Sequence, residues 1–204
     1  MKSWMMLALG MVVLTAGMPA LADGPEVTAL KETLTTAING STTASDEMKT
    51  FACEKLAPLC TNPVFVAEVA AQNAKGLTLE RIKQTDEAWI AAEDELAIHG
   101  ELLGNACAAE IKKVCKQVPA LTEVFVMDNQ GANVGQNALT SDYWQGDEPK
   151  WRNSFNGGEG GVDISKPKLD KSSGSVDQKV SLPIIDASGN VIGAVCFGVN
   201  PDAV

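Results

Sequence analysis

Three consecutive residues, Asp142, Tyr143 and Trp144, are the strongest candidates for chemistry in this chain. A carboxylate accepts hydrogen bonds from amines and hydroxyl groups, and the two aromatic side chains each offer a flat apolar face and one polar atom. Such side chains are typical of a pocket that binds a small molecule. The alternative is a structural corner, in which Trp144 fills the core and Asp142 caps a turn. The sequence leaves both interpretations open.

Catalytic and metal-binding patterns are missing from the sequence. His99 is the only histidine, which argues against a Cys/His zinc site and a serine-protease triad of the usual form. No Cys-x-x-Cys occurs, and the glycines at 157–161 are not followed by the Lys-Ser or Lys-Thr of a phosphate-binding loop. We therefore predict no catalytic residue, no metal and no cofactor, and an enzyme is the least favoured function.

The first 22 residues have the pattern of a secretory signal peptide. Lys2 gives a positive start, residues 5–16 are apolar, and a small-x-small cleavage pattern ends at Ala22. The apolar core is short for an uncleaved membrane anchor. We expect a periplasmic or secreted mature protein that is not embedded in the membrane after cleavage. The net charge of −10 argues against nucleic acid and anionic membrane surfaces as partners.

Five cysteines in an oxidising compartment favour disulfides: Cys53, Cys60, Cys107, Cys115 and Cys196. If two antiparallel helices carry the first four, Cys53 would pair with Cys115 and Cys60 with Cys107, which is the pairing that we prefer. The alternative pairs Cys53 with Cys60 and Cys107 with Cys115. It requires a helix break, because residues seven or eight apart lie about 10–12 Å apart along a helix axis. Cys196 lies in an apolar strand and is expected to be a buried thiol.

The chain before residue 119 is predicted to be mostly helical. Val27, Leu30 and Leu34 recur at helical spacing. A single helix is expected over residues 101–117, before Pro119. Further helices are predicted to begin near three residues: Ser45, Pro63 and Thr78.

The chain after residue 119 is predicted to alternate between strands and turns. The aromatic and acidic segment 140–148 follows the second strand and leads into a helix that carries Trp151 and Phe155. These two side chains are four residues apart and share one helical face. Residues 171–175 are expected to form a hairpin tip. The predicted strands are residues 122–128, 132–136, 162–165, 178–185 and 191–199.

The order and spacing of these segments resemble a Cache (PDC) domain, the extracytoplasmic PAS-like sensor of bacterial receptors. The resemblance covers residues 123–200, and Asp-Asn-Gln-Gly at 128–131 and Ser-Leu-Pro-Ile-Ile-Asp at 181–186 carry it together with segment 140–148. It implies an α+β fold, with an N-terminal helical region followed by a five-stranded antiparallel PAS-like sheet. It also implies a small-ligand pocket beside the central strands.

The expected organisation is a signal peptide at 1–22, a helical region with four cysteines at 23–118 and a Cache sheet at 119–204, the last two forming one composite domain. The resemblance implies ligand-binding roles for four residues: Asp142, Tyr143, Trp144 and Trp151. Amino-acid-binding members of the family have an arginine just before Trp-Tyr. This chain has none there, which argues against binding of an amino-acid carboxylate at that point.

The predicted function is a periplasmic sensor that binds a small molecule and lacks an output domain of its own. Such a protein would signal through a membrane partner, either a receptor or a transporter. The alternative is a non-catalytic structural or interaction protein that docks a partner through its helical region.

Overall fold

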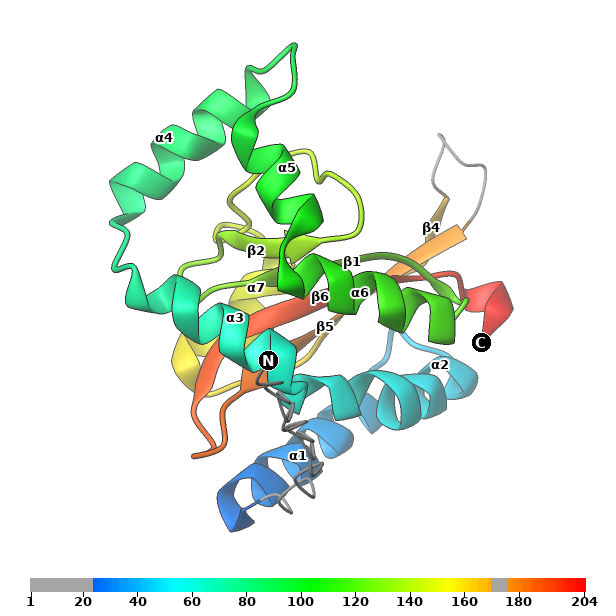
Figure 1. Cartoon of the computed structure of the whole chain (residues 1–204). Helices are drawn as coiled ribbons and strands as arrows, with labels where there is room; N and C mark the ends of the chain where they lie inside the picture. Colours follow the sequence, from blue (N-terminus) through cyan, green and yellow to red (C-terminus); the bar gives the residue numbers. More distant parts are fainter. Residues whose placement is uncertain (1–23, 170–175) are drawn as a thin grey trace, which may run out of the picture.

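The computed structural model describes residues 24–169 and 176–204. The predicted signal peptide and the predicted hairpin tip at 171–175 therefore lie outside the described residues. Figure 1 shows the arrangement of the helices around the sheet. The α-helices are α1 (Pro25–Asn39), α2 (Asp46–Phe51), α3 (Pro63–Ala74), α4 (Leu79–Ile90), α5 (Ala97–Gly104), α6 (Ala106–Gln117) and α7 (Pro149–Phe155).

The predicted helix starts are confirmed, and side-chain caps explain them. The Ser45 hydroxyl accepts a hydrogen bond from the backbone N–H of Met48 at 3.2 Å. Thr78 caps α4 in the same way, through the N–H of Arg81. Asn62 caps α3, and Pro63 occupies the first turn, where its missing N–H costs nothing.

The single helix predicted over residues 101–117 is wrong, because the chain breaks at Asn105. The Asn105 side chain accepts a hydrogen bond from the N–H of Ala108 at 2.9 Å and so starts α6. The same amide donates to the carbonyl of Val134 at 2.7 Å, which attaches the break to the sheet. An asparagine that finds such local partners competes with continuation of the helix.

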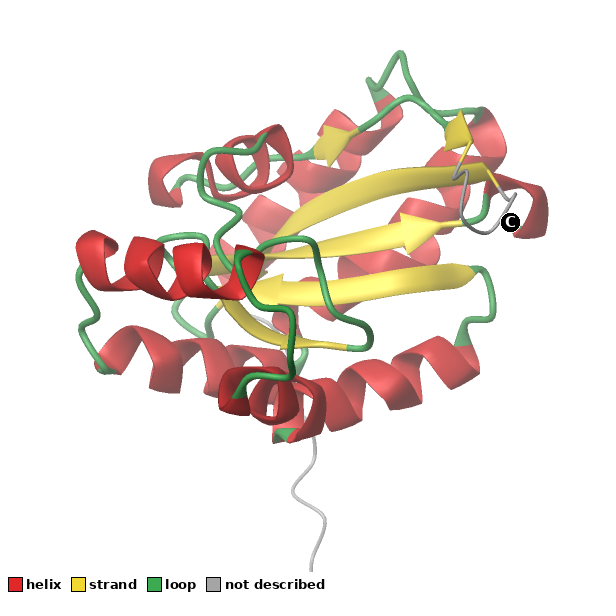
Figure 2. Cartoon of the chain, turned by 90° about the horizontal axis from the view of Figure 1, so that it is seen from above, coloured by secondary structure: helices red, strands yellow, loops and turns green. Residues whose placement is uncertain are grey.

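The sheet is antiparallel throughout and has the strand order β2-β1-β6-β5-β3, with β4 paired to β5 off this path. Figure 2 shows the strands as one layer with helices on either side. The predicted α+β fold, with N-terminal helices followed by an antiparallel sheet, is therefore confirmed. The strands are β1 (Leu121–Met127), β2 (Asn133–Gln136), β3 (Asp163–Ile164), β4 (Lys168–Leu169), β5 (Val176–Ile185) and β6 (Val191–Val199).

Successive residues of the central strands point to opposite faces of the sheet. On one face, Val126, Val195 and Phe197 join the main core, which also contains buried residues of α1, α3 and α6. We call this the helix-covered face. On the other, Phe125 and Cys196 form a small cluster with Met127 and Ala194, and Trp151 of α7 packs against it. We call this the α7 face.

The predicted disulfides are wrong for this structure, in which all five cysteines are free thiols. Cys107 packs against the sheet: a Cβ placed on Gly135 would lie 2.6 Å from its Cβ and 2.9 Å from its Sγ. The Cys107 side chain thus fills the space that this glycine leaves. Cys53 and Cys60 lie in a π-helix (Ala52–Leu56) and a 3₁₀-helix (Ala57–Thr61), so they do not share the regular α-helix that the spacing argument assumed.

Candidate ligand site on the α7 face of the sheet

A row of side chains crosses the α7 face from the edge strand β2 to β5. Gln136 pairs with Phe125, Phe125 with Cys196, and Cys196 with Ser181. Residues that are directly opposite in a sheet point to the same face, so these four side chains lie side by side. Asn133 stands on the same face of β2, opposite Met127. The row therefore places polar groups at both ends and an aromatic ring and a thiol between them.

Three buried polar atoms on this face have no hydrogen-bond partner in the described chain: Asn133 Oδ1, Gln136 Nε2 and Ser181 Oγ. Asn133 Nδ2 donates to Gln136 Oε1 at 3.2 Å, so the two amides touch and leave one acceptor and one donor unused. We call them the amide pair. Each unpaired buried group costs about 1–3 kcal/mol. Asn133 and Gln136 bring two such costs to one point. Two unpaired groups side by side indicate a site that serves a purpose other than stability.

The segment that follows β2 folds back towards this face. Gln145 is fully buried, and its amide donates to both the backbone carbonyl and the side chain of Asp142. Its oxygen accepts a hydrogen bond from Lys150 Nζ at 2.9 Å. The same ammonium lies 5.3 Å from the centre of the Phe125 ring and 3.0 Å from Glu148. Gln145 and Lys150, which belong to the segments covering the α7 face, therefore place further polar groups against this row.

Charges at the far end of the α7 face are paired. Lys179 contacts the carboxylates of Glu123 and Asp177 at 2.5 and 2.8 Å. Burial lowers the pKa of Lys179, but the two carboxylates outweigh it and the net pKa is raised. Burial also raises the pKa of the Cys196 thiol to about 12, so this sulfur is a neutral thiol at neutral pH. Such a thiol is a poor nucleophile, because the thiolate is the reactive form.

Of the four residues predicted to bind a ligand, Trp151 lies on the α7 face. Its indole N–H donates to the carbonyl of Asp128 at 3.0 Å, and its ring stacks on Phe155 at 5.0 Å. Asp142 is half-buried and reaches the site through its bonds with Gln145. Asp142 thus lies in the connection between β2 and α7, and Trp151 lies in α7 itself.

Tyr143 packs in a different cluster from the row. Its side chain is 3% exposed and lies among Ile82, Trp89, Leu102 and Ala132. Burial raises the pKa of the phenol to about 12, and the nearby carboxylate of Asp128 acts in the same direction. The ring is therefore a core side chain in this structure.

Trp144 packs at the rim of the same cluster. The Trp144 ring donates its N–H to the carbonyl of Gln130 at 2.7 Å and has Lys83 Nζ 4.7 Å from its centre. Its backbone forms a β-bridge with Ala132. Trp144 thus closes the corner between β2 and α4.

Sequence reasoning missed the amide pair, Ser181, Gln145 and Lys150. A usable signal for the strand residues was a polar side chain that stands opposite an apolar one on the neighbouring strand. Applying it requires the register, which the sequence alone does not specify. Gln145 and Lys150 carry no such signal, since only the folding-back of the connection places them.

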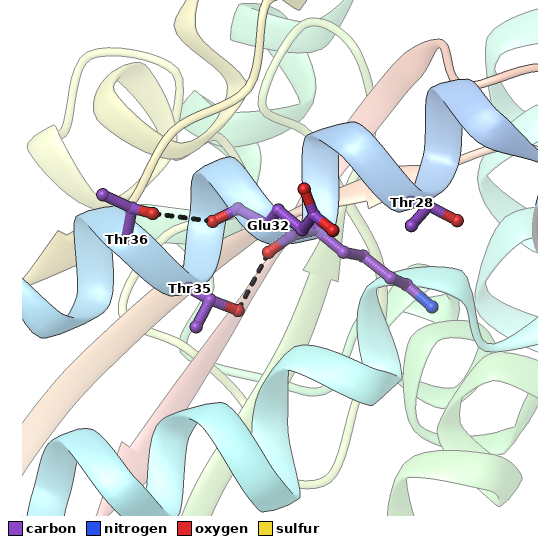
Figure 3. Close-up of a pocket in the computed structure, with 5 residues that line it drawn as sticks. Thr28, Glu32, Thr35 and Thr36 are labelled. Atoms are coloured by element: carbon purple, nitrogen blue, oxygen red, sulfur yellow. Dashed lines mark hydrogen bonds between the residues drawn. The ribbon is translucent and has the colours of Figure 1, made fainter.

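Two open hollows lie elsewhere on the protein. One, of about 420 Å³, is lined only by α1, and Figure 3 shows that the Thr35 and Thr36 hydroxyls bond to carbonyls of their own helix. The other, of about 440 Å³, lies on α2 and the following turn. Within residues 24–169 and 176–204, no cluster of side chains could hold a metal ion, and no helix has the length and apolar character needed to cross a membrane.

No protein-family model matches the chain, and a search of curated proteins gives no match either. Solved structures with a similar fold include the sensor domain of the histidine kinase DctB from V. cholerae, with a TM-score of 0.42, 14% identity, and coverage of 87% of this chain and 56% of that one. The ligand-binding domain of chemoreceptor Tlp3 from Campylobacter jejuni, in complex with 4-methylisoleucine, has a TM-score of 0.41, 13% identity, and coverage of 90% and 64%.

A third similar structure is the ligand-binding domain of the amino acid chemoreceptor PctC from Pseudomonas aeruginosa in complex with GABA, with a TM-score of 0.33, 14% identity, and coverage of 70% and 61%. The chain thus spans less than two thirds of the length of these structures. Their likeness concerns the fold alone, and no residue role is transferred from them.

Proposed function

We propose that this protein is a periplasmic sensor that binds a small molecule on the α7 face and signals through a membrane receptor or transporter. The observation that carries the proposal is the amide pair, in which a buried donor and a buried acceptor lie together without partners. The helices and the sheet act as one composite domain, because the main core contains residues of both. The localisation rests on the predicted signal peptide.

The chemistry of the site selects a ligand that carries both a hydrogen-bond donor and an acceptor. Gln136 Nε2 requires an acceptor, and Asn133 Oδ1 requires a donor. The Phe125 ring supplies an apolar surface beside them. Asp142 can receive an amine or a hydroxyl of the ligand if Gln145 releases it, and Trp151 forms the aromatic wall on the α7 face, whereas Tyr143 and Trp144 pack in the neighbouring cluster. The proposed ligand is therefore small, polar on one edge and apolar on the other.

The site is closed in this structure, since its polar atoms are buried. Entry of a ligand requires displacement of the connection that carries Gln145 and Lys150. Displacement exchanges the bond between these two side chains for bonds to the ligand, so that binding and rearrangement occur together. A sensor needs this property, because a site that binds without moving cannot report occupancy.

A thermal-shift screen of residues 23–204 tests the proposal. The probes are amines, hydroxy acids, amino acids and small amides, each of which has a donor and an acceptor. At least one is expected to raise the melting temperature, because a ligand that binds only the folded state stabilises it. If no probe does so, the sensor function is rejected.

The site is tested with the compound that stabilises best. Gln136→Met removes the unused donor, and the affinity per folded molecule is expected to fall about ten-fold or more. Gln117→Met is the matched control, because Gln117 is exposed at the end of α6. Equal affinity in the Gln136→Met variant and the wild type would move the site away from the amide pair.

A second function, docking of a partner through the helical region, has one observation in its favour. The hollow on α2 combines the half-buried ring of Phe51 with three carboxylates, those of Asp46, Glu47 and Glu54, against one ammonium, that of Lys55. An apolar ring among acidic groups suits a basic, partly apolar segment of another protein. This function would be favoured if the ligand-free protein is folded and no probe in the screen raises its melting temperature.

A further inference from the structure

We propose that helix α4 reports occupancy of the site. It is held against residues 140–144 while the site is closed, and it is released when the hydrogen bonds of the amide pair are disturbed. The inference rests on the proposed function, because it assigns to α4 the regulation of that same ligand site. Three features of the structure carry it: the separate packing of α4, its anchors, and a strip of chain that both α4 and the amide pair contact.

Helix α4 packs apart from the main core. Ile82 and Trp89 are its buried residues, and both belong to a small cluster with Leu102, Ala132 and Tyr143. Figure 1 shows α4 at the periphery, joined to α3 and α5 by loops. Gly76, in the loop before it, has φ of +60°, a conformation that other residues rarely adopt. An element with so few buried contacts opens at a lower free energy than the core.

Polar anchors hold α4 in place, and all of them lie on residues 140–144. Asp86 Oδ1 accepts the backbone N–H groups of both Tyr143 and Trp144, at 2.8 and 2.9 Å. Trp89 donates its indole N–H to the carbonyl of Thr140 at 3.0 Å. A carboxylate that accepts two N–H bonds is a stronger anchor than a neutral acceptor.

The same residues hold the amide pair from the other side. Thr140 Oγ1 accepts a hydrogen bond from Asn133 Nδ2 at 2.8 Å, and its single proton is shared between Gln136 Oε1 at 3.2 Å and the carbonyl of Asp142 at 2.6 Å. The carbonyl of Tyr143 accepts the backbone N–H of Asn133 at 3.0 Å. Thr140 thus binds the amide pair with its side chain and α4 with its main chain. Tyr143 binds the backbone of Asn133 with its carbonyl and α4 with its N–H.

The hydrogen bonds of residues 140–144 therefore couple the amide pair to helix α4. A ligand that draws Asn133 or Gln136 into new hydrogen bonds breaks their bonds to the Thr140 hydroxyl. Residues 140–144 then lose part of the hydrogen bonding that fixes them to β2, and the N–H groups bound by Asp86 move with them. Occupancy of the site is thereby converted into a change in how firmly α4 is held.

Hydrogen exchange of the ligand-free protein, followed by mass spectrometry, tests the coupling. Thr140→Val removes the hydroxyl that binds the amide pair, together with its bond to the carbonyl of Asp142, but keeps the carbonyl that binds Trp89. Amides of residues 79–90 are expected to exchange about five-fold faster in this variant. Thr140→Ser keeps the hydroxyl and is expected to retain the wild-type rate. Residues 25–39 of α1 serve as the internal reference and should not change.

Asp86→Ala is the positive reference, because it removes the main anchor directly. Faster exchange of α4 in Asp86→Ala with wild-type exchange in Thr140→Val would overturn the coupling, and so would equal acceleration in α1 and α4. Wild-type exchange of α4 in Asp86→Ala would overturn the anchor itself. None of these results uses a ligand, so they are independent of the thermal-shift screen that decides the proposed function.

Discussion

The two faces of the sheet differ in whether buried polar side chains interrupt their apolar packing. On the helix-covered face, the strands contribute apolar side chains to one continuous core shared with the helices. On the α7 face, the apolar cluster is limited to Phe125, Met127, Ala194 and Cys196, and polar side chains flank it. Three of the four buried side-chain atoms without a partner in the described residues, those of Asn133, Gln136 and Ser181, belong to the second face, and the fourth, His99 Nε2, lies in α5 beside Trp89.

The difference indicates that the two faces have different roles. Packing of apolar side chains stabilises the fold most where no polar group interrupts it. Unpaired polar atoms oppose folding, so a sequence that keeps three of them on one face gains something other than stability there. The helix-covered face therefore supports the fold, and the α7 face presents the candidate site.

Matched phenylalanine substitutions give the largest expected effect. Phe197→Ala, on the helix-covered face, is expected to lower the free energy of unfolding by about 3–5 kcal/mol, because it leaves a cavity in a large rigid core. Phe125→Ala, on the α7 face, is expected to cost about 1 kcal/mol less, because polar side chains can relax into its space. Urea denaturation of both variants measures the difference. An equal or larger loss for Phe125→Ala would remove the distinction between the faces.

The pH dependence of Tyr143 tests how closed the corner beside the α7 face is. Burial raises the pKa of the folded phenol from the ordinary 10.0 to about 12. The unfolded chain loses this proton first, so stability is full below pH 10 and falls as the pH rises towards 12, on the order of 1 kcal/mol per pH unit.

Tyrosinate absorbance reports this titration directly, because Tyr143 is the only tyrosine. A midpoint near the ordinary value in the folded protein would show an exposed ring and an open corner. Absorbance of the chain in denaturant provides the reference curve for the unfolded state.

Removal of an unpaired hydroxyl gives the smallest expected effect. Ser181→Ala on the α7 face deletes a buried oxygen that has only the Cys196 thiol, a weak hydrogen-bonding group, opposite it. The free energy of unfolding is expected to stay within about 0.5 kcal/mol of wild type or to rise. Thermal and urea denaturation provide the measurement. A loss of more than about 1 kcal/mol would mean that the hydroxyl is satisfied in solution and does not mark a site.

Local patterns in the sequence predicted much of the fold. The apolar runs at 122–128 and 191–199 predicted β1 and β6, because β-branched and apolar residues suit a buried strand. Ser45, Pro63 and Thr78 predicted the starts of α2, α3 and α4, since a cap or a first-turn proline acts within a few residues of its helix. The Asp142 segment was correctly singled out as a connection after the second strand.

The tertiary structure alone decided what these local patterns could not. Whether Asn105 interrupts a helix depended on a carbonyl of β2, and the environment of Cys107 depended on Gly135 in the same strand. The sequence determined which segments are helices and strands, because those preferences arise from neighbouring residues. The amide pair and the contacts of α4 join residues that are distant in the chain, and only the register and packing of the folded protein bring such residues together.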